Sequence, residues 1–343
     1  MAMGPTPRDR TSKTGAEAAC FAKFTRSDNM KVSQLLNYLT IPLILVANMA
    51  IAAQSVDKQL QVDDNLKLNI KVLRGDVKVR SWDKDEISVK GTLDELSEGF
   101  ILDKQGNQVT LEDKMPRHFN GNNKSGSDLT IMVPKNLTLD AEGLSSSYNL
   151  SSLSGIIGIY SVSGNINASD IDNQIFIHTV SGNIKTSKLT GKIKLDTISG
   201  SIKDKNSDGE ISYKLVSGDL TANSSAENVS IEQISGDANV QLKKVNELKV
   251  KTISGDITLA VSSLKSRANL DSVSGGIELK LPKNLAANFN INGGPGGKIR
   301  NSLTDDEPKK EKYSPTSYLK FQTGSTGADI KISTISGSIK LSD

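Results

Sequence analysis

Three aspartates recur at matching places in this 343-residue chain and are its clearest candidates for binding chemistry. Asp219, Asp237 and Asp256 each follow a Ser-Gly pair, and they are nearly equally spaced along the chain. Carboxylates stacked along one edge could bind Ca²⁺, which takes about six to eight oxygen ligands. However, the paired glycines of calcium-binding nonapeptide repeats are missing, and Asp is also a common turn former. The sequence leaves calcium binding open beside a purely structural role.

The serines of the same Ser-Gly pairs could be mistaken for catalytic nucleophiles. A serine nucleophile needs an adjacent base, and the only histidines are His118 and His178, in unrelated contexts. Polysaccharide-acting enzymes with β-helical folds need converging carboxylates or Ca²⁺ with a basic proton acceptor, and no repeat carries such a distinguishing cluster. We therefore expect a non-enzymatic protein with no catalytic residues, no cofactor and no metal site beyond the open calcium question.

Two other patterns resemble recognition motifs. Arg74-Gly75-Asp76 spells an integrin-type tripeptide, but its Gly-Asp occupies the same corner context as the later repeats. Four threonines share one repeat position, as in ice-binding arrays, but no second threonine follows two residues away. These threonines are Thr179, Thr197, Thr252 and Thr334. Neither pattern is taken as the function.

The elements that position all these residues follow from an internal repeat. The unit Val/Ile-Ser-Gly-x-Ile/Leu recurs eight times with small variations, and helix-pair repeats need longer periods of about 33 residues or more. Its serines are Ser163, Ser181, Ser199, Ser217, Ser235, Ser254, Ser274 and Ser336. The first five serines keep a constant period, the next two intervals are slightly longer, and the last serine follows after a long gap.

Each repeat has the alternation of β-strands. Apolar and polar residues alternate over 248–252 and again over 253–259. We expect Ile253 and Gly255 to face inward together with the other alternate residues of the second segment. Val250 of the first segment also faces inward but lies three positions before Ile253, so the alternation shifts by one residue between them, which requires a bend. Each turn is then two short strands joined by corners, about 4.8 Å from its copy. The predicted fold class is all-β, a single-stranded parallel β-helix or β-solenoid with ~18-residue turns.

One domain is expected to fill residues 53–343. Its regular turns span 155–275, an excursion spans 293–320, and a closing turn spans 328–341. Tyr313 and Tyr318 in the excursion are candidate partner-binding residues, because tyrosine offers an apolar face and a hydroxyl group. The alternative is an excursion that only connects two turns, since long loops are functional or simply linkers.

The first 52 residues have the order of an export signal after an upstream extension. Residues 1–29 are the extension, and residues 30–52 are the predicted signal peptide, with Met30-Lys31, the apolar run 41–47 and small residues at its end. The run is shorter than the ~20 apolar residues of a membrane span. We expect no transmembrane span in the mature chain.

The leader also carries the basic excess. Residues 1–52 contain six basic and three acidic residues, which leaves 36 of each in 53–343 from totals of 42 and 39. A nucleic-acid partner is therefore not expected, because it would require a clustered basic surface. Cys20 is the only cysteine, which excludes a disulfide framework and a cysteine-based zinc site.

The Ser-Gly units, the earlier Leu73-Arg74-Gly75-Asp76-Val77 element and the strand end Val133-Pro134 together resemble a bacterial family of exported β-strand-repeat proteins called putative adhesins. The resemblance covers about 60–343, and the family is a domain of unknown function without defined catalytic residues. It implies an exported protein, periplasmic or at the cell surface, that binds or scaffolds an envelope protein or glycan. An accessory or sensory protein of an envelope-stress system is the alternative, and a polysaccharide-acting enzyme ranks below both.

Overall fold

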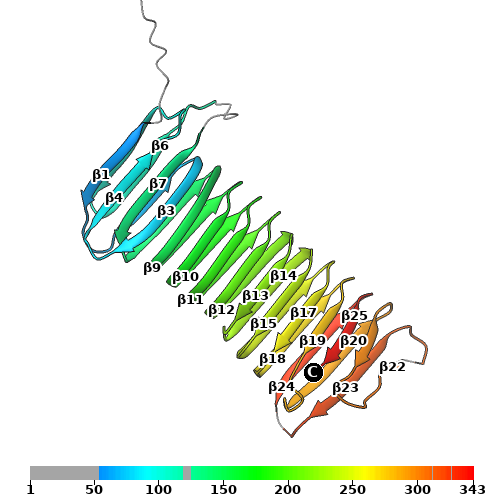
Figure 1. Cartoon of the computed structure of the whole chain (residues 1–343). Coiled ribbons are helices and arrows are strands. Elements are labelled where there is room, and N and C mark those ends of the chain that lie inside the picture. The colour runs from blue at the N-terminus through cyan, green and yellow to red at the C-terminus, as the bar shows by residue number, and fades with distance from the viewer. Residues whose placement is uncertain (1–53, 119–124, 311, 326) are drawn as a thin grey trace, which may run out of the picture. The chain divides into compact units, whose positions relative to one another are not determined.

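The computed structural model describes residues 54–118, 125–310, 312–325 and 327–343, and these consist of β-strands and connecting turns without any helix (Figure 1). The all-β class is therefore confirmed. No helix in these ranges could cross a bilayer. The expected extension (1–29) and signal peptide (30–52) lie outside the described residues.

The strands are numbered in chain order. They are β1 Ser55–Gln61, β2 Lys67–Lys71, β3 Arg74–Trp82, β4 Glu86–Thr92, β5 Gly99–Gln105, β6 Gln108–Lys114, β7 Ser127–Pro134, β8 Asn136–Gly143, β9 Ser145–Ser161, β10 Ile166–Thr179, β11 Ile184–Thr197, β12 Ile202–Ser217, β13 Leu220–Ser224, β14 Asn228–Ser235, β15 Ala238–Leu242, β16 Val245–Thr252, β17 Ile257–Val261, β18 Leu264–Ser272, β19 Ile277–Lys280, β20 Ala287–Gly294, β21 Lys298–Asn301, β22 Lys309–Lys310, β23 Ser317–Thr323, β24 Ala328–Thr334 and β25 Ser338–Ser342.

The regular repeats stack in parallel at the period of the sequence. In β10, Ile175 lies opposite Ile157 of β9 on one side and Ile193 of β11 on the other, so each partner is one full sequence period away. Similar parallel pairing continues through β12, β14, β16 and β18 (Figure 1). This stacking gives a β-solenoid-like arrangement in which each turn is one rung.

The inward side chains of a rung change phase at bends. In β10, Ala168 and Ile171 are both buried although they are three positions apart, and the intervening Asp170 has a φ of 53°. A second bend follows at the exposed Asn173, which has a φ of 97°, and the inward phase of Ile171 continues at Ile175. The rungs of β10, β11 and β12 are thus each bent twice between their Ser-Gly corners, which is one bend more than the sequence predicted.

The Ser-Gly corners are the points of closest approach between rungs. A Cβ atom built on Gly200 would lie 1.9 Å from the carbonyl oxygen of Gly182, so only glycine fits without moving the backbone. The buried Thr197 hydroxyl donates to the same Gly182 oxygen at 3.4 Å. The Gly182 N–H in turn donates to the Thr179 hydroxyl at 3.1 Å. The four threonines of the shared repeat position therefore face inward, which rules out an ice-binding surface, and Thr179, Thr197 and Thr334 hydrogen-bond to the corner backbone.

The expected inward position of Ile253 is wrong. Its side chain is 50% exposed, while the preceding Thr252 is buried. The physical reason is that the backbone polar groups of the corner need partners inside the turn. At several corners a polar side chain supplies such a partner, as Thr197 and Gln233 do, whereas the buried Leu215 fills the same inner place without one. The Val or Ile before each Ser-Gly pair is consequently turned outward.

At both ends of the stack, one segment is inserted between its neighbours. Strands β2 and β3 lie between β6 and β7 on one side and β8 and β9 on the other. Likewise, β24 and β25 lie between β18 and β19 on one side and β20 and β21 on the other. The segment expected as a closing turn (328–341) therefore stacks directly on the regular rungs, and β20 and β21 lie beyond it.

Antiparallel strands flank these inserted segments. Strand β1 pairs with β4, which pairs with β7, and β5 pairs with β6. Near the other end, β23 pairs antiparallel with β20 and with β22. We call the first group, β1 with β4 to β7, the N-terminal cap.

Candidate functional site

The two tyrosines expected at a partner-binding edge lie in different settings. Tyr313 follows β22 and is 91% exposed, with the Lys312 Nζ 5.5 Å from its ring centroid. Tyr318 is half-buried in β23, opposite Asn292 of β20 and Lys309 of β22. Within the described residues no ring contact joins the two tyrosines. They stay separate candidates for binding.

The three repeat aspartates connect successive rungs. Asp237 donates its backbone N–H to an Asp219 carboxylate oxygen at 3.0 Å, and Asp256 donates to Asp237 in the same way at 2.9 Å. Asn183 and Asn165 make the equivalent bond at 3.0 Å. One oxygen of each linked carboxylate thus caps a backbone group of the next rung. In the described part of the chain no group of three or more His, Cys, Asp or Glu residues is placed to bind a metal ion.

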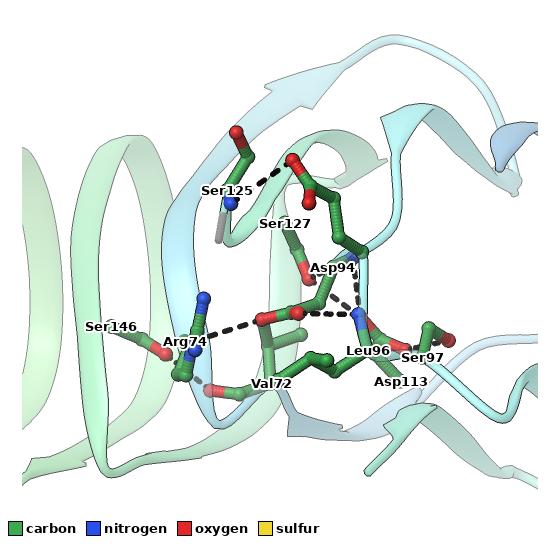
Figure 2. A network of polar contacts seen from close by, with 10 residues as sticks. Val72, Arg74, Asp94, Leu96, Ser97, Asp113, Ser125, Ser127 and Ser146 are labelled. Atoms are coloured by element: carbon green, nitrogen blue, oxygen red, sulfur yellow. Dashed lines mark hydrogen bonds and ion pairs between the residues drawn. The ribbon is translucent and has the colours of Figure 1, made fainter. Parts of the chain in front are cut away.

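The Arg74-Gly75-Asp76 tripeptide is not presented as a recognition motif. The Arg74 guanidinium is only 10% exposed and forms an ion pair with Asp94 at 3.0 Å (Figure 2). Asp94 also accepts the backbone N–H of Leu96 at 2.8 Å. The neighbouring Asp113 is buried and accepts from the Ser127 hydroxyl at 2.5 Å. This network joins the N-terminal cap to β3 and has a structural role.

A different cluster of aromatic side chains lies on the outer surface of the first regular rungs. Tyr160 of β9 is 43% exposed, and its ring centroid is 5.2 Å from that of Phe176 and 6.5 Å from that of His178, both in β10. The Lys194 ammonium of β11 lies 4.8 Å from the Phe176 ring centroid. The half-buried Phe176 and the exposed Tyr160 form a partly exposed apolar platform whose two ring planes are tilted by 48°.

The platform borders a hollow of about 360 Å³, which we call the aromatic hollow. Gly158 lines it and lies opposite Phe176 in the strand register. A Cβ atom on Gly158 would make only ordinary contacts, the nearest at 3.6 Å, so this glycine is not required for packing. The missing side chain leaves the surface open between Tyr160 and Phe176.

The rim of the aromatic hollow supplies polar groups of both signs. Its lining includes the Asp140 carboxylate, the Gln174 amide and the Lys192 ammonium, all exposed. The exposed Ile156 adds a further apolar wall, at 50% exposure. An apolar floor with a few polar groups around it is the usual composition of a small-ligand site. The arrangement can stack a flat ligand on the rings while the rim hydrogen-bonds to its hydroxyl groups.

A second surface, the lysine groove, follows the segments that begin each rung. It has a volume of about 760 Å³ and is lined by Lys185, Lys203 and Lys205 together with Arg80. Asn167 donates its side-chain amide to the Asn149 side chain at 2.8 Å along the same surface. The groove is positively charged, and its lining has no acidic residue. It could attract an anionic polymer, although it has no apolar platform.

The aromatic hollow was not predicted from the sequence, although the repeat pattern contains residues that indicate it. Tyr160 and His178 are one repeat period apart, as are Gly158 and Phe176, and each pair lies in register. At the same outward positions the later rungs carry residues such as Lys194 and Ser212. Aromatic residues at outward repeat positions, instead of Lys or Ser, are the pattern that indicates such a surface.

Three solved structures each cover 84% of this chain at low identity. A "putative adhesin" from Parabacteroides merdae is 12% identical with a TM-score of 0.38, and covers 84% of this chain and 96% of its own. A "putative cell adhesion protein" from Clostridium sporogenes is 12% identical with a TM-score of 0.22, covering 84% and 99%. A "putative lipid binding protein" from Parabacteroides distasonis is 14% identical with a TM-score of 0.33, covering 84% and 96%.

None of these three names denotes an enzyme. No curated protein matches the chain. The family model described as Toastrack DUF4097, a domain of unknown function, matches residues 65–342. That match extends from β2 to β25 and includes every regular rung. The chain therefore belongs to the Toastrack DUF4097 family, as the resemblance of its repeats to adhesin-like proteins predicted.

Proposed function

We propose that this chain is an exported, non-enzymatic protein of the bacterial cell envelope that binds glycan at the aromatic hollow. Export rests on the order of charge, apolar run and small residues over 30–52. The binding role rests on the one observation that the exposed Tyr160 ring and the half-buried Phe176 ring lie beside an unfilled position at Gly158. The fold that carries them is a single-stranded parallel β-helix filling one domain, 53–343.

A sugar ring fits the chemistry of this surface. One face of many pyranose rings presents C–H groups, which pack on an aromatic ring, while the hydroxyl groups at the ring edge need hydrogen-bond partners. Asp140 and Gln174 offer acceptors, and Lys192 and Lys194 offer donors. The exposed carboxylate and ammonium groups also match a glycan that carries both amide and acidic substituents.

The aromatic hollow is tested by filling it. We expect Gly158→Val to weaken binding at least tenfold, measured with soluble peptidoglycan fragments and a panel of purified envelope polysaccharides. A Cβ atom at this position makes only ordinary contacts and valine favours strands, so the melting temperature should stay close to that of the wild type. Ser230→Val is the matched control, because Ser230 occupies the same outward column four rungs from Gly158.

Two further variants separate this surface from the excursion. Tyr160→Ala should lose binding as Gly158→Val does, whereas a Tyr313→Ala, Tyr318→Ala double variant should bind as the wild type does. Loss of binding in the double variant with full binding by Gly158→Val would refute the proposed site. Cell fractionation tests export, because a cytosolic chain that still contains residues 31–52 contradicts it.

A further inference from the structure

The outward-turned aliphatic residues form a continuous stripe, which we call the aliphatic edge. Its exposed members retain 37% to 55% of their accessible surface, and Val180 continues the stripe in a half-buried position. They are Leu144, Val162, Ile198, Val216, Ile234, Ile253, Val273 and Ile335. Backbone hydrogen bonds connect neighbouring rungs along it, as from the Ser254 N–H to the Ile234 carbonyl at 2.8 Å. An aligned set of exposed aliphatic side chains marks an interaction surface.

Charged residues run beside the aliphatic edge and alternate in sign. Lys214 lies opposite Glu232 in the strand register, Glu232 opposite Lys251, and Lys251 opposite Asp271. These four residues and Val216, Ile234, Ile253 and Val273 line the same groove, whose volume is about 530 Å³. The groove thus has one aliphatic wall and one wall that alternates positive and negative at the spacing of the rungs, about 4.8 Å.

The alternation decides which arrangement of two copies is favourable. When two such faces meet with their rungs running in the same direction, each charge meets its own copy, which is repulsive. When the rungs run in opposite directions about a twofold axis between β14 and β16, Glu232 meets the partner's Lys251 and Lys214 meets the partner's Asp271. The same axis places Ile234 against the partner's Ile253. An isologous contact of this kind is closed and self-complementary.

Other outward-facing charged residues of the same strands also meet opposite charges when the two copies are related by this axis. The strand order places Glu210 of β12 opposite the partner's Arg267 of β18, and Lys192 of β11 opposite the partner's Asp329 of β24. Lys194 and Lys331 form the one like-charged pair among these columns. The acidic corner residues lie beyond the aliphatic edge, on the side away from the charged wall.

The geometry points to a second copy of this chain as the partner of the aliphatic edge, bound antiparallel across β11 to β24. A standard interface covers about 800 Å² on each partner. A single edge with one charged wall is narrower than that, so the expected dimer is weak and forms at micromolar concentration. Charge complementarity in such a contact sets the orientation and partner choice more than the affinity.

Charge exchange tests the antiparallel arrangement by sedimentation equilibrium on the purified chain. Glu232→Lys alone should weaken the dimer about tenfold or more, because two attractive contacts become repulsive in each dimer. The double variant Glu232→Lys, Lys251→Glu should restore the wild-type affinity. Lys203→Glu in the lysine groove is the control and should change nothing. A wild-type chain that stays monomeric at millimolar concentration, or a double variant no better than the single one, would overturn the inference.

Cross-linking tests the same arrangement without changing charge. In a Cys20→Ser background, an equal mixture of Val216→Cys and Val273→Cys chains should form disulfide-linked dimers on mild oxidation, because these positions face each other across the axis. Val216→Cys chains alone should stay unlinked, since their cysteines lie about three rungs apart, or roughly 14 Å. Efficient linking of Val216→Cys chains alone would show parallel pairing and contradict the antiparallel dimer. Wild-type circular dichroism in both variants excludes misfolding as the cause of either result.

Discussion

The N-terminal cap and the regular rungs are stabilised in different ways. In and beside the cap, each polar contact occurs once: Arg74 pairs with Asp94, and Asp113 accepts hydrogen bonds from Ser97 and Ser127 (Figure 2). In the rungs one contact recurs, as when the Thr179 and Thr197 hydroxyls each donate to a glycine carbonyl of the preceding rung. The difference shows that a few kinds of contact, repeated from rung to rung, stabilise the regular stack. The end of the stack is stabilised by contacts that occur only there.

The largest effect is expected where a unique contact is removed. Asp94→Ala removes the buried carboxylate that pairs with the Arg74 guanidinium, and breaking a buried ion pair in this way typically costs about 3–5 kcal/mol. Urea unfolding followed by circular dichroism measures this loss. The control is Asp57→Ala, because the Lys90–Asp57 pair is 60% and 67% exposed and should contribute little. Equal destabilisation by both variants would contradict the distinction between the cap contact and an ordinary surface pair.

A smaller but clear effect is expected at a repeated contact. Gly200→Ala places a Cβ atom 1.9 Å from the Gly182 carbonyl oxygen, so the two rungs must separate locally. We expect a loss of about 1–3 kcal/mol, as for other overpacked sites, measured by the same urea unfolding. Gly158→Ala is the matched control and should be nearly neutral, because its nearest contact would be 3.6 Å. If both glycines tolerate alanine equally, close approach at the corners is not what requires glycine.

The last effect is absent at neutral pH and grows at alkaline pH, and it arises in the stack, from Tyr148 of β9 and Tyr213 of β12. Burial, and next the charge of Asp204, raises the pKa of Tyr213 well above its usual value, and burial followed by the charge of Glu142 raises the pKa of Tyr148. Above pH 10 the unfolded chain loses these protons while the folded chain retains them. Stability is therefore complete below pH 10 and falls as pH rises, by about 1.4 kcal/mol per pH unit for each tyrosine.

Thermal unfolding between pH 9 and 11.5 measures this decline. Tyr213→Phe should reduce the loss of stability per pH unit by the contribution of one tyrosine. This holds whatever the substitution does to stability at neutral pH. Tyr313→Phe is the control, because Tyr313 is almost fully exposed and should leave the slope unchanged. If stability falls equally steeply at alkaline pH in the wild type and in both variants, the buried Tyr213 is not a cause of the fall.

The stacking of the rungs could be predicted because it depends on the repeat period. The period stays recognisable even where individual residues of the repeat differ. Which residues face inward at the corners could not be predicted. An alternating pattern that passes through a bend can continue with either set of alternate residues facing inward. The aliphatic residue at Ile253 favoured the wrong one, since apolar residues are usually buried. At a corner such as that of Thr197, the hydroxyl takes the inner place and hydrogen-bonds to the backbone, whereas Leu215 shows that an aliphatic side chain can also fill it.

The candidate sites were harder to predict than the fold. Tyr313 and Tyr318 were chosen because they break the repeat, whereas the aromatic hollow lies within it, where Tyr160 and Phe176 occupy ordinary outward positions. Their significance depends on the neighbour in the next rung, which becomes visible only once the register is known. The alternating charges from Lys214 to Asp271 depend on register in the same way.

The insertion of β2 and β3, and of β24 and β25, between two neighbouring layers has a consequence for how the protein resists loss of structure. A simple stack unravels from its outermost strand, one layer at a time, because that strand is paired on one side only. Here the segments 67–82 and 328–342 are paired on both sides. Fraying of β1 or β22 therefore exposes no regular rung, and a protease or a pulling force must break two sets of pairings together before unravelling begins. Such a molecule is expected to persist through slow unfolding rather than through high equilibrium stability alone.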